Sequence, residues 1–285
     1  MSQYIHGNNV VDKVSKHTSG EKKDVISKIH RRYLLWRQDN ESITGILRRD
    51  ITKKTKLLNR YKNFVHGLNK KGLGGYVFTF QSKLEPTILE EFLYYLFKDI
   101  PVLKGKNLKL GPVDAYVEMG FAPNDIESFE KDVSLDITTK DQDFAISRPV
   151  FYVVASEPTE TAKYKELSVP IVAIEVKTYL DKTMLVGAAG TAERLKAANP
   201  NALFLLVTET TGVGKGVVLG KTKIDEIFVI RKQRSIEKDM PGKLKPIDDQ
   251  VVWDLFSMVR DHLKRKWIKA SDDALSTGRL INRSG

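Results

Sequence analysis

Two opposite charges lie near the end of an apolar run and could act together on one substrate group. The run covers residues 171–178 and reads IVAIEVKT. Side chains alternate between the two faces of a β-strand, so Glu175 and Lys177 share a face and lie roughly 6 to 7 Å apart along it. A carboxylate and an ammonium in a buried strand are costly to desolvate unless each meets a partner or an ion. The pattern therefore predicts a functional site.

Further carboxylates precede this strand in the sequence. Asp136, Asp141 and Asp143 form an acidic cluster, and Asp143 begins the segment DFAI, which suits a strand. Farther upstream, Glu85 stands at the start of a predicted apolar helix, with Pro at its first position, that ends at Ile100-Pro101. We interpret Glu90 and Glu91 on that helix as surface charges.

The surrounding pattern predicts the elements that position these residues. A helix with Asp181 near its start is expected over residues 180–198 and an amphipathic helix over 251–267. Strands are expected at 113–117, 133–137, 151–155, 202–207 and 228–230. The glycine-rich residues 212–222 fit neither a Walker loop nor a dinucleotide fingerprint, because Lys215 and Leu219 occupy positions that need glycine, so a β-hairpin is predicted there.

The positive charge is concentrated at the N-terminus. The 285-residue chain has a net charge of +11, and residues 1–75 alone hold 17 basic and 6 acidic side chains, which accounts for the whole excess. After a loose arm at residues 1–20, near-helical apolar spacing with a break at residues 39–40 predicts a basic helical lobe, and glycines in residues 70–75 predict a hinge. We therefore divide the chain into a DNA-recognition lobe (1–75), a core (76–235) and a C-terminal helical segment (236–285).

A basic lobe attached to a neutral body indicates a polyanionic partner, most often nucleic acid. Lysine and arginine side chains interleaved with the apolar positions would contact phosphates or base edges. The candidates are Arg31, Arg32, Arg48, Arg49, Lys53 and Lys54.

Several classes of protein are excluded or disfavoured. The absence of cysteine excludes disulfides, thiolate metal sites and cysteine nucleophiles. No apolar run approaches the roughly 18 residues of a membrane span, and the polar start is no signal peptide, so a cytoplasmic protein is expected. The histidines of the N-terminal lobe lack metal-ligand spacing, which disfavours a zinc-bound nuclease.

A carboxylate on one strand followed by Glu-x-Lys on a later, more buried strand resembles the PD-(D/E)xK nuclease superfamily. The matching residues are Asp143, Glu175 and Lys177. Gln142 stands where the family has proline, which leaves Asp136 or Asp141 as alternatives to Asp143, and Glu85 as a further carboxylate that such nucleases often carry on the preceding helix. The resemblance implies an α/β fold with a central mixed sheet flanked by helices, here joined to the basic helical lobe.

The same resemblance implies the chemistry. Asp143, Glu175 and the main-chain carbonyl of Val176 would be hard oxygen ligands for Mg²⁺, and Lys177 would position or deprotonate a water and stabilise charge on the scissile phosphate. Members of the superfamily typically leave 5′-phosphate and 3′-hydroxyl ends. The whole chain looks like a subunit of a type II restriction endonuclease, so double-stranded DNA is the expected partner.

One chain contains one such constellation, whereas a duplex has two strands. Two subunits are therefore expected: a second related nuclease subunit, which would suit an asymmetric site, or a second copy, which would suit a palindrome. A repair or junction nuclease and a non-catalytic DNA-binding subunit remain as alternative functions.

Overall fold

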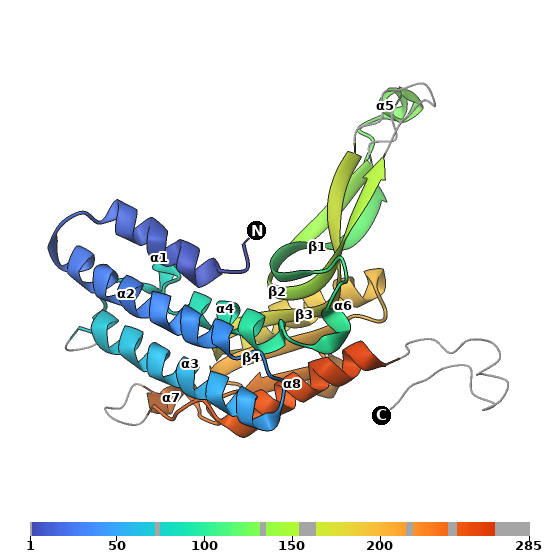
Figure 1. Cartoon of the computed structure of the whole chain (residues 1–285). Coiled ribbons are helices and arrows are strands. Elements are labelled where there is room, and N and C mark those ends of the chain that lie inside the picture. The colour runs from blue at the N-terminus through green and yellow to red at the C-terminus, as the bar shows by residue number, and fades with distance from the viewer. Residues whose placement is uncertain are drawn as a thin grey trace, which may run out of the picture.

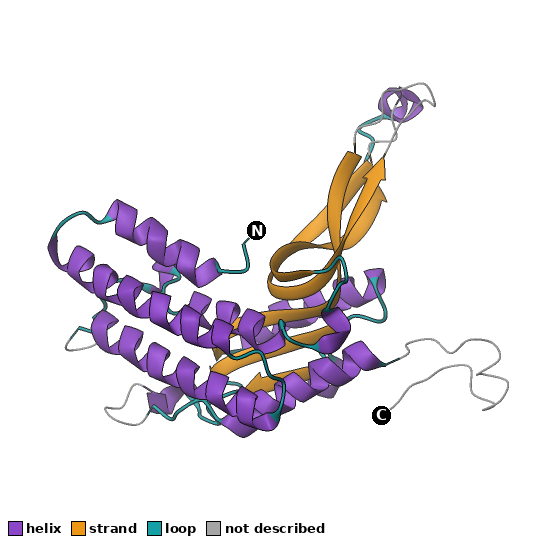
Figure 2. Ribbon diagram, in the orientation of Figure 1, coloured by secondary structure: helices purple, strands orange, loops and turns teal. Residues whose placement is uncertain are grey.

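The computed structural model describes residues 2–71, 75–131, 135–153, 164–214, 219–238 and 244–265. A central helix, α4 (Pro86–Phe97), lies between a layer of N-terminal helices and a β-sheet (Figures 1 and 2). The predicted α/β class, with a mixed sheet flanked by helices, is confirmed. None of the described helices is both long and apolar enough to cross a membrane.

The N-terminal helices are α1 (Ile5–Lys16), α2 (Gly20–Ser42) and α3 (Arg48–Asn69). The prediction that residues 1–20 form a loose arm is wrong, because α1 buries Val10 and packs against α2 and α4. Gly7 permits close approach, since a Cβ at this position would lie 2.1 Å from the Tyr33 hydroxyl oxygen. The break predicted at residues 39–40 is absent, because α2 runs through them.

The strands are β1 (Lys109–Phe121), β2 (Leu135–Val153), β3 (Tyr164–Leu180), β4 (Leu203–Thr211) and β5 (Glu226–Val229). They lie in sequence order in the sheet. β2 pairs antiparallel with β1 and with β3, whereas β4 pairs parallel with β3 and with β5. The two short strands predicted at 133–137 and 151–155 are the opposite ends of the single strand β2, as far as residues 135–153 describe them.

The remaining helices are α5 (Ile126–Lys131), α6 (Lys182–Ala198), α7 (Ser235–Lys238) and α8 (Asp249–Lys264), and 3-10 turns cover Phe80–Ser82, Pro101–Leu103 and Leu219–Lys221. Asp181 caps α6 by accepting a hydrogen bond from the backbone N–H of Met184 at 2.8 Å. The predicted hairpin at 212–222 falls partly outside the described residues, because 215–218 are not among them.

β1, β2 and the first part of β3 extend away from the helices as a long arm, with α5 near its end (Figure 1). We call this projection the arm. It leaves the body next to the point where β2 meets β3.

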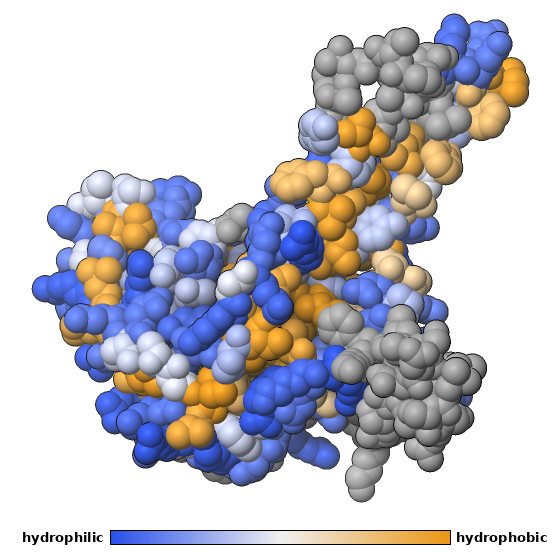
Figure 3. Space-filling model, turned by 45° about the vertical axis from the view of Figure 1, so that its right-hand side comes forward, coloured by the Kyte–Doolittle hydropathy of each residue, from blue (hydrophilic) through white to orange (hydrophobic). Residues whose placement is uncertain are grey.

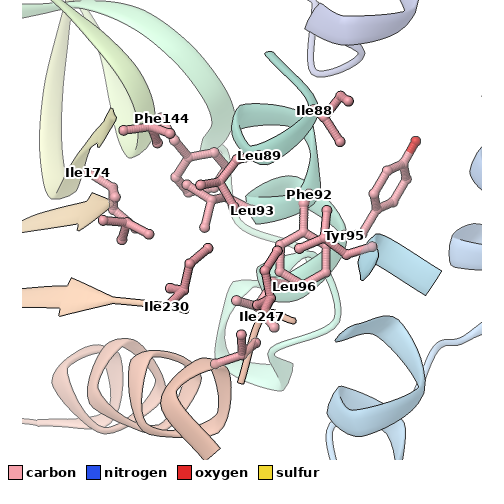
Figure 4. Packing of buried hydrophobic residues seen from close by; sticks show 14 of the residues in the cluster. Ile88, Leu89, Phe92, Leu93, Tyr95, Leu96, Phe144, Ile174, Ile230 and Ile247 are labelled. Atoms are coloured by element: carbon pink, nitrogen blue, oxygen red, sulfur yellow. The ribbon is translucent and has the colours of Figure 1, made fainter. Parts of the chain in front are cut away.

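Helix α4 supplies the centre of the hydrophobic core. Nine of its twelve residues are buried, so it has almost no solvent face. Leu89 and Leu93 lie toward Phe144 and Ile174 of the strands (Figure 4), and all four belong to one hydrophobic cluster. Each such side chain contributes about 1.5–3 kcal/mol when fully buried. The helix therefore binds the helical layer to the sheet.

The same cluster crosses the boundaries that we predicted near residues 75 and 235. It includes Trp36 of α2, Phe92 of α4 and Phe256 of α8. The predicted segments 1–75, 76–235 and 236–285 thus share one core in the described part of the chain. Of the predicted hinge, residues 72–74 lie outside the described residues, and Lys70 forms a β-bridge with Tyr76 on either side of them.

Glu91 of α4 is buried and joins α4 to the helical layer, contrary to our interpretation of it as a surface charge. Its carboxylate accepts hydrogen bonds from the hydroxyls of Tyr33 (3.0 Å) and Tyr95 (2.6 Å) and from the backbone N–H of Gly7 (2.9 Å). Burial raises the pKa of Glu91, although these hydrogen bonds oppose the shift. The carboxylate is therefore a structural acceptor.

Replacing Glu91 with Ala should lower the free energy of unfolding by about 3 kcal/mol or more, because buried donors left without an acceptor cost roughly 1–3 kcal/mol each. Urea denaturation measures the change. Glu127→Ala on the exposed surface of α5 is the control and should change stability little. An equal, small effect of both substitutions would contradict the structural role of Glu91.

Candidate active site

The strands β2 and β3 separate at one point, and the candidate site lies there. Their antiparallel pairing reaches Phe144 opposite Ile174 and is not continued to the next pair. Beyond this point the Asp143 carboxylate accepts a hydrogen bond from the backbone N–H of Val176 at 2.7 Å. The Asp143 side chain thus takes the place of a backbone acceptor. This hydrogen bond holds Asp143 beside the end of the apolar run in β3.

Glu175 and Lys177 lie on the same side of β3, and Lys177 Nζ is 2.8 Å from Glu175 Oε1. Both side chains are partly buried. Burial opposes the charge of Lys177, but the hydrogen bond with Glu175 and the nearby carboxylates Asp143 and Glu90 raise its pKa above the ordinary value. The lysine is therefore a fully protonated cation at the point where the strands part.

The structure adds Glu90 of α4 to this group, contrary to our interpretation of it as a surface charge. Burial and the charge of Asp143 raise the pKa of Glu90 to about 7, while Lys83 and Lys177 oppose the shift. Burial also raises the pKa of Asp143, against the effects of the Val176 N–H and Lys177. Negative charge at this site is thus incompletely compensated by the protein's own cations.

Glu85, the helix carboxylate that we considered for the site, lies in a different environment. It accepts a hydrogen bond from Asn69 at 2.9 Å and is 3.2 Å from Nδ1 of His66, both on α3. The sequence did contain a signal for Glu90: a charged residue in a helix that is apolar on nearly every side must lie in or beside buried surface. We read only the apolar stripe and missed it.

The alternative aspartates lie elsewhere. Asp141 is exposed and stands opposite Asp114 of β1, and Asp136 stands opposite Gly120 on the arm. Among the described residues, neither is hydrogen-bonded to β3, whereas Asp143 is. Of the three aspartates, the structure therefore brings only Asp143 into hydrogen-bond contact with the strand of Glu175.

The oxygen atoms at this site can be compared with the ligands that the expected Mg²⁺ requires. Within the described ranges, no three or more Asp, Glu, His or Cys side chains are grouped so as to hold a metal ion by themselves. Asp143, Glu175 and the Val176 carbonyl are nevertheless hard oxygen donors, and Mg²⁺ usually keeps several waters and needs only one or two carboxylates. The raised pKa values of Asp143 and Glu90, in spite of the nearby Lys83 and Lys177, suit a site that a further cation completes. The residues present fit the ion.

The basic candidates divide into exposed and structural residues. Arg31, Arg32, Arg49 and Lys53 are exposed. Arg48 is half-buried and lies 3.4 Å from Asp249 with its guanidinium over the Trp253 ring. Lys54 is fully buried, where it donates to the Tyr95 carbonyl at 2.7 Å and pairs with Asp99 at 3.0 Å. Burial lowers its pKa. The prediction that Lys54 contacts DNA is incompatible with this burial.

Helix α3 presents a basic stripe on one exposed face. Arg49, Lys53, Lys56 and Arg60 are all exposed and spaced by four, three and four residues, which places them on one face of the helix. We call these four residues the α3 stripe. The regular spacing of these basic residues was visible in the sequence. The burial of a lysine such as Lys54 was not.

Comparisons with known proteins agree with this geometry. A family model described as Bpu10I restriction endonuclease matches residues 81–268, while no curated protein matches the sequence. A solved structure described as the native BbvCI A2B2 tetramer at low resolution has the same fold, with a TM-score of 0.74 and 23% identity over 92% of this chain and 97% of that one. From the sequence we also expected a likeness to the second subunit of the heterodimeric BbvCI enzyme, and this match confirms a BbvCI-like fold.

The matched family segment contains α4, all five strands and α6, and so includes every residue at the point where β2 and β3 part. The chain therefore belongs to the Bpu10I restriction endonuclease family and is a type II site-specific nuclease.

Proposed function

We propose that this subunit is a Mg²⁺-dependent endonuclease that hydrolyses one strand of duplex DNA at a specific sequence and leaves 5′-phosphate and 3′-hydroxyl ends. The observation that carries the proposal is the hydrogen bond from Val176 to Asp143, which holds one carboxylate beside the Glu175–Lys177 pair. Asp143, Glu175 and Lys177 are the proposed catalytic residues.

Asp143, Glu175 and the Val176 carbonyl would hold Mg²⁺, which when bound would supply positive charge and lower the pKa of a coordinated water. Lys177 stabilises the charge that develops on the phosphate, because its ammonium is protonated and partly desolvated. Glu90 adds a carboxylate from α4 that can accept a proton or a hydrogen bond from water near neutral pH. These roles account for a buried cluster of like charges.

Duplex DNA is the proposed substrate, and the exposed α3 stripe with Arg31 and Arg32 of α2 is the proposed contact surface. Exposed arginines and lysines bind phosphates and release condensed counterions, so binding should weaken steeply with salt. Arginine can also read guanine in the major groove through paired hydrogen bonds.

The proposed assembly contains a second, related nuclease subunit. A single constellation of catalytic residues attacks one strand, and the structural neighbour is described as an A2B2 tetramer. We infer the same kind of assembly here, with two different subunits that read the two halves of an asymmetric sequence.

Lys177→Glu should abolish hydrolysis at this site and largely spare DNA binding, because it replaces the cation that faces the phosphate with a charge that repels it. Supercoiled plasmid incubated with the complex and Mg²⁺ reports the result. A complex with an intact second subunit should nick one defined strand, whereas a homodimer should cut neither. Lys165→Glu, an exposed residue on the same strand, is the control. Retained double-strand cleavage by Lys177→Glu would refute the assignment of the catalytic strand.

Glu90→Gln should reduce the single-turnover cleavage rate by about 100-fold or more, the effect expected when a group that transfers or holds a proton loses that ability. The amide has the same size, so folding and DNA binding measured without divalent metal should change little. Glu193→Gln on the exposed surface of α6 is the matched control. Equal cleavage rates for both variants would remove Glu90 from the site.

Arg49→Ala combined with Lys53→Ala should weaken DNA binding and lower the slope of log affinity against log salt by about one unit for each lost phosphate contact. Fluorescence anisotropy at several salt concentrations measures both quantities. The control is Lys104→Ala combined with Lys106→Ala, which removes the same charge from an exposed loop outside the N-terminal helices. If the two pairs behave alike, DNA binds elsewhere.

A further inference from the structure

Lys83, which lies just before α4, has a backbone conformation that lysine rarely adopts. Its φ is 53°, in the left-handed region that favours glycine. A residue with a side chain is strained there, because its Cβ crowds the following carbonyl oxygen. Glycine would adopt this conformation without strain, so the side chain of Lys83 needs a role that offsets the cost. Strained residues of this kind gather at functional sites.

Neighbouring segments hold the Lys83 backbone in place. The side-chain amide of Asn9, on α1, donates hydrogen bonds to the carbonyls of Ser82 at 3.2 Å and of Lys83 at 3.1 Å. The Lys83 carbonyl also accepts hydrogen bonds from the hydroxyl (2.8 Å) and the backbone N–H (3.4 Å) of Thr87 in α4. The backbone of Lys83 is therefore fixed between α1 and α4, while the residue as a whole stays exposed.

Lys83 lies on the side of α4 that faces the candidate active site. Because its carbonyl bonds to an N–H four residues on, residues 83–86 form an irregular first turn that leads into α4. Glu90 follows Lys83 by seven residues, which is about two helical turns, so the two residues lie on one side of the helix. The positive charge of Lys83 acts to lower the pKa values of both Glu90 and Asp143, against the larger effect of burial.

A second lysine with a positive φ shows what is different about Lys83. Lys232, with φ of 47°, follows β5, and its ammonium lies 2.8 Å from the Asp248 carboxylate at the start of α8. That ion pair gives the Lys232 side chain a partner within the protein. Among the described residues, the Lys83 ammonium makes no such pair. Its charge is therefore available to an anion outside the protein.

The surface beside Lys83 suits a polyanion. The helical layer, to which α1 belongs, presents a largely hydrophilic surface, whereas apolar side chains gather along the arm (Figure 3). The Lys13 ammonium donates a hydrogen bond to Oδ1 of Asn9, so the side chain that holds the Lys83 backbone also holds a second cation nearby. Lysine contacts of this kind with DNA are mostly made to phosphate oxygens.

We propose that Lys83 contacts the substrate: its ammonium binds a phosphate of the cleaved strand next to the scissile one, on the α4 side of the active site. The proposal rests on the proposed cleavage function. Lys177 faces the scissile phosphate from β3, so two lysines from different elements hold the strand across the carboxylates of the site. A lysine suits such a contact, because it presents a point charge on a long stem. The fixed, left-handed backbone sets where that stem begins.

Lys83→Gly removes the ammonium and relieves the strain, so the variant should fold at least as well as the wild type. The complete enzyme with its partner subunit is tested on a duplex that carries a cleavage site mapped on plasmid DNA. The slope of log affinity against log salt, measured by fluorescence anisotropy without divalent metal, should fall by about one unit. Single-turnover cleavage with Mg²⁺ should slow by about tenfold or more, because a less well positioned strand reacts more slowly.

The control is Lys232→Gly, which makes the same change at the other exposed lysine with a positive φ and should leave both quantities unchanged. Lys83→Arg keeps the charge and should keep the salt slope. Lys83→Asn, which also tolerates a positive φ, should repeat the effect of Lys83→Gly, and circular dichroism melting verifies the folding of each variant.

An unchanged salt slope in Lys83→Gly, or an equal fall in Lys232→Gly, would overturn the proposal. Slower cleavage without a change in slope would overturn it too, since that result assigns Lys83 a purely structural role. Failure of the proposed function gives a different result: cleavage retained by Lys177→Glu, or a wild-type enzyme that binds DNA without cutting it. The salt slope of Lys83→Gly on a mixed-sequence duplex would still decide whether Lys83 contacts DNA.

Discussion

The site depends on a single hydrogen bond at the place where two strands stop pairing. If the ladder between β2 and β3 continued, the Val176 N–H would belong to a backbone carbonyl and Asp143 would be one more residue of the sheet. Because the strands part, this N–H needs another acceptor, and the Asp143 carboxylate supplies it at 2.7 Å. The bond holds the carboxylate beside Glu175 without using Lys177. The Lys177 ammonium is then available to pair with Glu175.

Two adjacent glutamates of α4 show how one helix serves both the core and the site. Successive residues of a helix point about 100° apart, so Glu90 and Glu91 face different neighbours. Glu91 meets donors from α1 and α2 and is satisfied by them, whereas Glu90 meets the charges of Asp143 and Lys177. Any displacement of α4 by the helical layer would also move Glu90. The packing that stabilises the fold therefore sets the position of a residue in the site.

The sequence predicted the fold class, the start of α4, the helix capped by Asp181 and the buried strands, because these depend on local periodicity and capping. It failed where packing between distant segments decides the outcome. α1 contains Gly7, Asn8 and Asn9, which disfavour a helix, yet packing against α4 overrides that preference. The length of β2 and the position at which it leaves β3 are also set by tertiary structure. Residue type alone could not reveal that Lys54 is buried. For Glu90, the apolar helix around it indicated buried surroundings, but its position beside Asp143 and Lys177 depends on how α4 packs against the sheet.

Because some basic residues are buried in ion pairs, the net charge of the chain does not directly describe the electrostatic field outside the protein. Lys54 pairs with Asp99, and Lys62 pairs with Glu209, which is also 2.8 Å from Arg231. These pairs cross-link the helical layer to α4 and the sheet, and breaking a buried pair typically costs about 3–5 kcal/mol. They contribute little to the field outside the protein. The external field comes from exposed side chains such as the α3 stripe, and from the arm, where residues 114–141 hold eight acidic and two basic side chains. A duplex approaching this subunit is thus attracted to the helices and repelled from the arm, which orients it before any base is read.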